Sequence, residues 1–339
     1  MSGKRARTTC LVVVLSWLAG TVSAADRDVD ANAIRKAVGR ALPLLEQSAA
    51  TYIEKRDCFS CHHQALPAVT LARARTAGFK VDRERARDQS EFTQAYFAGR
   101  RKRVRAGEGV PGGAYTAGYA LWSLAADGFE PDEVTADMVS YLHHKHQADG
   151  SWRIHTHRPP LEDSDFTATA LSLKGLQLFA GKDQAEDLAE RTRRARGWLL
   201  KAEPKTNEDR VFRLLGLKWA GADRKDIKRP GRKLLKRQRD DGGWSQLDEM
   251  TSDAYATGQA LYALETAAVL DPDDKAFRRG VVYLLKAQQA DGSWKVTTRS
   301  KAIQKFFESG FPHGKSQFIS TCGTCWATMA LLEALLAGR

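Results

Sequence analysis

The chain has 339 residues, of which 42% are apolar and 28% are charged, a balance that is typical of a packed soluble protein and excludes a disordered one. No uninterrupted apolar run reaches the roughly 18 residues that a membrane span requires, so the sequence excludes an integral membrane protein. The formal net charge is +12. Acidic residues nevertheless alternate with the basic ones along the helices, which indicates solvated faces and no nucleic-acid partner.

The first 24 residues have the pattern of a secretory signal peptide. Three basic residues, Lys4, Arg5 and Arg7, precede the apolar segment 11–19, and small residues follow up to Ala24. We therefore expect cleavage near Ala24, a periplasmic or secreted location, and a single mature domain over residues 25–339. The mature chain keeps four cysteines in an oxidising compartment.

Helical hairpins repeat along the rest of the chain. Three segments follow the pattern Q-x-x-D-G-x-W, with His in place of Gln in the first: 146–152, 238–244 and 288–294. Their spacing predicts a period of about 46 residues and a degenerate copy between the first two. Each turn joins an amphipathic outer helix to an inner helix that is apolar almost all round.

The periodicity predicts twelve helices in six hairpins and no strand of any length. The outer helices are expected at about 34–53, 83–103, 131–147, 185–202, 224–239 and 274–289. The inner helices are expected at about 63–77, 113–126, 165–180, 207–220, 253–268 and 321–337. In each turn the Asp-Gly pair ends the outer helix, and the Trp is expected to cover the joint between neighbouring hairpins.

Six hairpins with these turns resemble the (α/α)6 toroid of squalene–hopene cyclases and protein prenyltransferase β-subunits, over residues 31–337. The resemblance implies a closed ring in which the first hairpin lies beside the sixth. The inner helices would surround a central cavity. Two long loops, 153–162 and 305–318, precede inner helices and would lie over the same mouth of that cavity.

The resemblance also suggests catalytic carboxylates. Cyclases of this kind protonate an alkene with the middle Asp of a D-x-D-D motif, and the nearest match is Asp163-Ser-Asp165-Phe166. Asp165 and its repeat counterpart Asp253 are the candidate catalytic residues. Either Asp could instead cap its inner helix. On this interpretation the protein is a cyclase-like or prenyltransferase-like enzyme with an apolar isoprenoid substrate.

The first turn carries a different motif, Cys58-Phe-Ser-Cys61-His62, which is similar to the haem attachment site of c-type cytochromes. Our leading interpretation is therefore an exported protein that binds haem c and has a redox or electron-transfer role with a redox partner. Cys58 and Cys61 would attach the haem and His62 would bind the iron. His313, on the second rim loop, is the expected sixth ligand, and His157 competes with it.

The second cysteine pair leaves a zinc site open as an alternative cofactor. Ring closure would bring Cys322 and Cys325 close to Cys58 and Cys61, and four cysteines at C-x-x-C spacings suit tetrahedral zinc. Cys322 also precedes Trp326 by four residues, as the zinc-binding Cys of prenyltransferases precedes a Trp. In that case the protein could be a binding module without catalytic activity.

Overall fold

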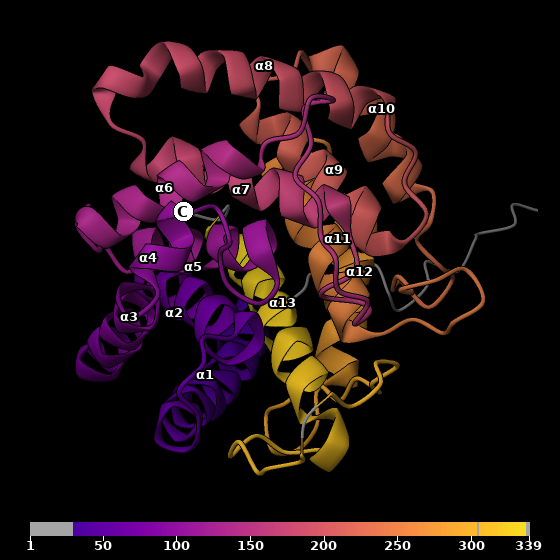
Figure 1. Ribbon diagram of the computed structural model, residues 1–339. Helices are drawn as coiled ribbons and strands as arrows, with labels where there is room; N and C mark the ends of the chain where they lie inside the picture. The colour runs from indigo at the N-terminus through magenta and orange to yellow at the C-terminus, as the bar shows by residue number, and fades with distance from the viewer. Residues whose placement is uncertain (1–29, 304, 337–339) are drawn as a thin grey trace, which may run out of the picture.

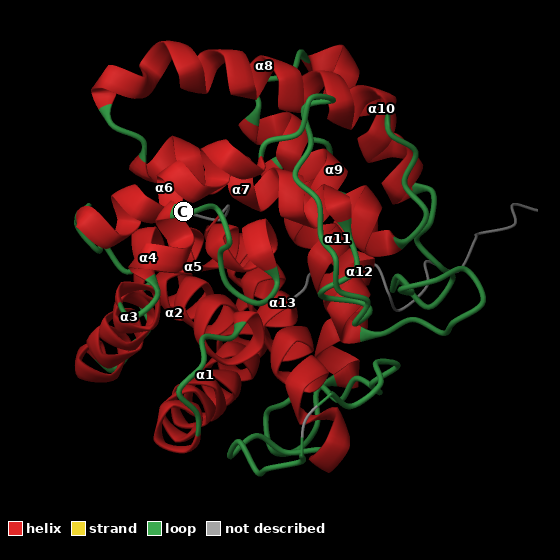
Figure 2. Cartoon of the chain, viewed as in Figure 1, coloured by secondary structure: helices red, strands yellow, loops and turns green. Residues whose placement is uncertain are grey.

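The structure, a computed structural model, describes residues 30–303 and 305–336. Within these ranges the secondary structure is helical, and no strand occurs (Figure 2). Outer and inner helices alternate along the described chain as the repeat predicts, which confirms the all-α toroid. The predicted signal peptide, residues 1–24, lies outside the described residues.

The helices lie close to their predicted ranges. The outer helices are α1 (Ala31–Lys55), α3 (Arg83–Ala98), α6 (Glu133–Lys145), α8 (Ala185–Lys201), α10 (Arg224–Leu235) and α12 (Lys275–Ala287). The inner helices are α2 (Leu66–Thr76), α5 (Gly113–Ala126), α7 (Asp165–Phe179), α9 (Asn207–Trp219), α11 (Ala254–Thr266) and α13 (Gln317–Leu336). A π-helical turn, Cys61–Ala65, leads into α2, and single 3-10 turns, Lys182–Gln184 and Gly314–Ser316, precede α8 and α13.

Some helix boundaries differ from the sequence prediction. The expected outer helix 83–103 ends at Ala98, and a separate short helix, α4 (Arg101–Arg105), follows it. The last inner helix begins four residues early, at Gln317. The segment Gly314–Leu336 is long and apolar enough to cross a membrane by length and composition, but 89% of its most apolar window is buried inside the protein. It is therefore packed as a core helix.

The inner helices form a closed ring. Each one contacts the next in the order α2, α5, α7, α9, α11 and α13, and α13 contacts α2. Figure 1 shows α1, at the indigo end of the colour scale, beside the yellow α13. The predicted closure of the toroid, with the first hairpin against the sixth, is therefore confirmed.

The three turn tryptophans hold the hairpins together. Trp152, Trp244 and Trp294 are completely buried. Each indole N–H donates to the carbonyl of the residue ten positions earlier, at 2.7–2.9 Å. Each Trp backbone N–H donates to a threonine hydroxyl of the following inner helix, at 2.9–3.0 Å. Because no polar atom of these side chains is left unpaired, their large apolar area contributes fully to the core.

The same turns also join each hairpin to the next outer helix. Gly292 has φ +92°, and a Cβ there would lie 2.6 Å from the carbonyl oxygen of Arg40 in α1. Gly150 meets Arg194 of α8 in the same way, at 2.4 Å. The Gln288 side chain donates to the Ala37 carbonyl at 2.8 Å. The joint that closes the ring is thus built like the joints inside it.

Candidate functional site

A cavity of about 340 Å³ opens between the two rim loops. Its walls come from the segment 158–162, from the segment 298–306 and from the beginning of α13, and His62 lies in the wall on the side of the first hairpin. The apolar lining residues are Pro159, Pro160, Leu161, Ala302, Ile303, Phe306, Phe318 and Ile319. The prediction that both loops border one mouth agrees with this geometry.

The charged side chains at this mouth cavity are mostly basic. Arg158 forms an ion pair with Glu162, which is the one acid among the lining residues. Lys301, Lys305 and Lys315 also line the cavity, and within the described chain no ion pair joins them to a carboxylate. The cavity therefore combines apolar walls with a surplus of positive charge.

His62 is a neutral imidazole in the cavity wall. Burial, with a further contribution from the positive charge of Arg158, lowers the pKa of His62 to about 3. Its ring lies 4.9 Å from the Phe318 ring, centroid to centroid, and its Nδ1 contacts Nδ1 of His63. The Nε2 atom of His63 lies 3.5 Å from the Thr321 hydroxyl of α13, so this histidine pair bridges the first and sixth hairpins.

The residues of the C-x-x-C-H segment have separate surroundings in the structure. Of its three key residues, His62 alone lines the mouth cavity. The Cys58 sulfur lies 3.3 Å from the Tyr52 hydroxyl, whereas the Cys61 thiol lies in the interior close enough to Tyr115 for that tyrosine to influence its pKa. Burial and the nearby Glu162 carboxylate raise the pKa of Cys61 to about 12, which keeps it a thiol. The two sulfurs thus face different partners, and haem attachment stays a prediction of the motif.

The four cysteines do not converge on one point either. Cys61 and Cys322 are electrostatic neighbours in the interior, as ring closure predicts. Cys325, however, has Thr70 as the neighbour that influences its pKa, and Cys58 lies beside Tyr52. No group of three or more His, Cys, Asp or Glu side chains suited to a metal ion occurs in the described part of the chain. The four-cysteine zinc site therefore stays a prediction of the sequence.

A buried carboxyl group lies inside the ring of inner helices. Glu208, the second residue of α9, is 3% exposed. Its Oε2 accepts hydrogen bonds from the Tyr255 hydroxyl and from Gln259 Nε2, both at 2.7 Å, and its Oε1 accepts one from the Thr167 hydroxyl at 3.0 Å. Burial outweighs these hydrogen bonds and raises the pKa of Glu208 to about 7. The group can therefore gain or lose a proton near neutral pH.

Two tyrosines lie between this acid and the cavity wall. Tyr115 and Tyr119 are completely buried, their rings are 5.0 Å apart, and their hydroxyl groups have no hydrogen-bond partner among the described residues. Tyr115 is close enough to interact electrostatically with Glu208 and with Glu162 of the mouth cavity. Buried hydroxyls without a full set of partners are rare in native structures. The interior therefore offers polar groups below the mouth.

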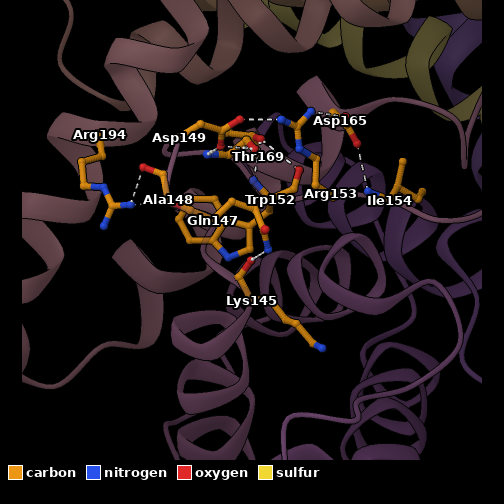
Figure 3. Close-up of polar contacts among 11 residues, drawn as sticks. Lys145, Gln147, Ala148, Asp149, Trp152, Arg153, Ile154, Asp165, Thr169 and Arg194 are labelled. Carbon is orange, nitrogen blue, oxygen red and sulfur yellow. Dashed lines mark hydrogen bonds and ion pairs between the residues drawn. The ribbon is translucent and has the colours of Figure 1, made fainter.

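Asp165 does not face this interior (Figure 3). One carboxylate oxygen accepts a hydrogen bond from the Ile154 backbone N–H at 3.0 Å, and the other forms an ion pair with Arg153 at 2.7 Å. Arg153 also contacts Asp149 of the turn, which fixes the rim loop to the beginning of α7. The structure thus places Asp165 in the turn, next to Ser164, whose side chain caps the helix.

Asp253 caps α11. Its Oδ1 accepts a hydrogen bond from the Ala256 backbone N–H at 2.9 Å, and its Oδ2 accepts one from Gln246 at 3.1 Å. Burial raises the pKa of Asp253 to about 6. Neither Asp165 nor Asp253 lines the mouth cavity.

The rim histidines are engaged locally. His313 Nε2 lies 2.7 Å from the Ser293 hydroxyl, so the ring points to the turn that precedes its own loop. His157 is 2.7 Å from Asp163 and its side chain is 86% exposed. Neither residue lines the mouth cavity beside His62. A role of either residue as an iron ligand stays a prediction of the sequence.

The sequence interpretation missed Glu208 because its hairpin lacks the repeat signature. The only signal was an acid near the start of an otherwise apolar inner helix. Thr206 and Asp209 form a capping box there, which explains why Thr206 and Asp209, and not Glu208, bond to the helix end. A residue one position away on a helix points about 100° elsewhere. Glu208 consequently faces the ring interior.

Comparisons with known proteins agree with this architecture. The family described as the squalene-hopene cyclase C-terminal domain matches residues 199–338, a range that includes Glu208 and α13. No curated protein sequence matches the chain. The fold is similar to that of the type II terpene cyclase MstE from Scytonema, without ligand, at a TM-score of 0.59 and 14% identity over 91% of this chain and 100% of that one.

Two further solved structures have the same overall arrangement. The R337A variant of MstE in complex with geranylgeranyl dihydroxybenzoate gives a TM-score of 0.58 at 15% identity, over 91% of this chain and 99% of that one. A protein from Klebsiella pneumoniae described as a possible member of family GH105 gives 0.53 at 12% identity, over 93% and 96%. At these identities the comparisons establish the fold, and a toroid of this kind supports more than one chemistry.

Proposed function

We propose that the protein is an enzyme of the terpene cyclase kind, which takes an apolar isoprenoid substrate through the mouth cavity and uses Glu208 as its acid–base group. The observation that carries this proposal is a buried carboxyl with a pKa near 7 inside the ring, below a cavity with apolar walls. An acid whose pKa lies near the working pH is suited to proton transfer. Tyr115 and Tyr119 would line the passage between the two.

The chemistry needs no second substrate. The protonated Glu208 carboxyl gives its proton to one carbon of an alkene, and the π electrons form the new C–H bond. The positive charge left on the neighbouring carbon is attacked by another double bond, which closes a ring, and loss of a proton restores an alkene. Faces of buried aromatic rings such as Tyr119, Tyr255 and Trp326 would stabilise the cation. The product is an isomer of the substrate.

Support for the substrate class comes from the comparisons and from the cavity. MstE has geranylgeranyl dihydroxybenzoate as its substrate and merosterolic acid A as its product in the solved complexes. In the present chain the cavity wall presents Leu161, Phe318 and Ile319 to a ligand. Apolar walls with a few polar groups are typical of small-molecule sites.

The test is isomerisation of geranylgeranyl dihydroxybenzoate, followed by chromatography and mass spectrometry. We expect products of unchanged mass from the native chain and a loss of 100-fold or more in rate for Glu208→Gln. Asp165→Asn is the matched control, because it also changes a carboxylate to an amide but lies in the turn beside Arg153. Equal loss in both variants, or none in Glu208→Gln, would contradict the assignment of the acid.

A second candidate is the exported haem c protein with an electron-transfer role that the C-x-x-C-H motif predicts. One observation favours it, namely a neutral His62 imidazole in the wall of an apolar cavity. Haem attachment would require Cys58 to leave Tyr52 and Cys61 to leave Tyr115. The cyclase-type proposal requires no such rearrangement of the cysteines.

A further inference from the structure

The mouth cavity is positively charged at its outer edge and apolar in its inner wall. Its exposed outer edge carries Lys301, Lys305 and Lys315, whereas Leu161 and Ile319 in its inner wall are buried. Two exposed apolar residues that also line the cavity, Ile303 at 66% and Phe306 at 45%, alternate in the sequence with these lysines. They are the most exposed large apolar side chains of the described chain. Such residues gain most when a ligand covers them.

Among the described residues, no carboxylate pairs with the lysines of the outer edge. The one acid in the lining, Glu162, is already paired with Arg158, and His62 is neutral. The three lysine side chains are left with a net charge of their own and are free to bind an anion. Lys305 contributes its backbone carbonyl to Arg56, so its ammonium group is not used in that contact.

We propose that the substrate of this site is an anionic amphiphile, with a carboxylate or phosphate head held by Lys301, Lys305 and Lys315 and an apolar tail in the cavity. This inference rests on the proposed function, since it names the substrate class of the same site. The head stays at the rim and the tail enters first. The opposite orientation would bury the anion beside Leu161 and neutral His62, far from the lysines, which is unfavourable.

The cavity also limits the length of the tail that it accepts in this conformation. A volume of about 340 Å³ corresponds to roughly eleven groups of the size of a water molecule, at about 30 Å³ each. A tail of about a dozen carbons therefore fills it. Longer isoprenoid tails would have to pass Tyr115 toward Glu208, where the acid lies. Tail length and head charge can thus be tested separately.

The experiment compares three probes with the same tail, namely dodecanol, dodecanoate and dodecyl phosphate, in displacement of a fluorescent fatty acid below their micelle concentrations. We expect both anions to bind about tenfold or more tightly than dodecanol at low salt. The preference should shrink in 1 M NaCl, because exposed charges are screened. The ratio of the affinities for dodecanoate and dodecyl phosphate identifies which head group the three lysines prefer.

Charge variants then assign the preference to the rim. The triple variant Lys301→Ala, Lys305→Ala and Lys315→Ala should lose the tenfold preference and keep its affinity for dodecanol. The matched control is Lys225→Ala, Lys233→Ala and Lys236→Ala, three exposed lysines on and beside α10, and it should keep the preference. Circular dichroism verifies that both triple variants fold.

The outcomes separate this inference from the proposed function. Equal binding of dodecanol and the two anions would overturn the anionic head. An equal loss of the preference for anions in the α10 control variant would overturn it as well. Neither result would affect the isomerisation test. A clear preference for anions in a protein that isomerises nothing would overturn the catalytic role of Glu208 and leave the amphiphile site in place. Absence of binding by all three probes would overturn the inference as well.

Discussion

Glu208 illustrates how a single buried residue can dominate the pH response of the protein. Its carboxyl is held by donors from Tyr255 and Gln259 on α11 and from Thr167 on α7. Burial nevertheless raises its pKa to about 7. In an unfolded chain the pKa of a Glu side chain is about 4.3. The folded state therefore binds the proton more tightly than the unfolded state.

This difference predicts a loss of stability with rising pH. The stabilisation is fully present below about pH 4.3 and disappears as the pH rises through 7, with a total on the order of 3 kcal/mol. Glu208→Gln should remove this part of the pH dependence, because the amide can keep the two donors at its oxygen and donate to the Thr167 hydroxyl, which can also accept. Urea unfolding at pH 5 and pH 8 measures the effect. An unchanged pH slope in the variant would show that Glu208 is not the responsible group.

The C-x-x-C-H motif makes a separate prediction at the residue scale. It predicts that the mature chain, purified from a host with haem-maturation machinery, shows a Soret band and keeps its haem in denaturing electrophoresis. Cys58→Ala with Cys61→Ala should remove both signals. The control is Cys322→Ala with Cys325→Ala, which leaves the motif intact. A colourless protein with four free thiols would reject haem and leave the cyclase-type proposal unaffected.

Sequence reasoning predicted the structural role of residues that recur in the repeat. It did not predict the role of residues that occur only once. The turn tryptophans recur three times with the same neighbours, so their structural role was predictable from the pattern. Asp165 and Asp253 begin inner helices, where an acid suits a cap, a rim ion pair and a catalytic site equally well. Successive positions on a helix point in directions about 100° apart, so a shift of one residue changes whether an acid faces the turn, the rim or the ring interior. The packing of the helix in the folded structure determines which direction a given position faces.

The cysteine and histidine motifs show the same limit. Their spacing along the chain was read correctly, and ring closure does bring Cys61 next to Cys322. The direction of each sulfur depends on neighbours from other helices, such as Tyr115 and Thr70, which the spacing does not reveal. Likewise His313 turns toward Ser293 because its own backbone has φ +83°.

At the scale of the elements, the turn glycines determine how closely hairpins approach. Gly292→Ala should destabilise the protein by roughly 2–5 kcal/mol, because the new Cβ meets both a positive φ and the Arg40 carbonyl at 2.6 Å. Gly128 is the matched control, with φ +76° and no heavy atom within 4 Å of its added Cβ. Gly128→Ala should cost only about 1–2 kcal/mol. Thermal unfolding distinguishes the two, and equal losses would mean that the close approach to α1 is unimportant.

For the whole molecule, the ion pair between Arg73 of α2 and Glu333 of α13 joins the first and last inner helices. Glu333 is 5% exposed, and the neighbouring Glu265 has its pKa raised to about 7 by burial and by the Glu333 charge. Arg73→Met would leave both acids without a cation. We expect a destabilisation of about 3 kcal/mol or more at pH 8.

The loss in Arg73→Met should be smaller at pH 5, where the two carboxyl groups can be protonated. Burial raises the pKa of both carboxyl groups in the folded state, that of Glu265 to about 7, so stability falls as the pH increases through the range in which they lose their protons. Arg193→Met is the control, because Arg193 pairs with Glu190 on the exposed surface of α8 and should change little. Urea unfolding at both pH values measures the difference. A loss of stability in Arg73→Met that is the same at both pH values would contradict this account of the contact between α2 and α13.

The contact between Gln288 and Ala37 also determines when the ring can close during synthesis of the chain. These residues are 251 positions apart, so a growing chain exposes the partner surface of α1 until the last turn has been made. At about 5–20 residues per second, synthesis takes roughly 10–50 s to cover that interval. During this period the first hairpin has no neighbour on one side, and its apolar residues can associate with other chains. The contact that closes the ring can therefore form only after the last turn has been synthesised.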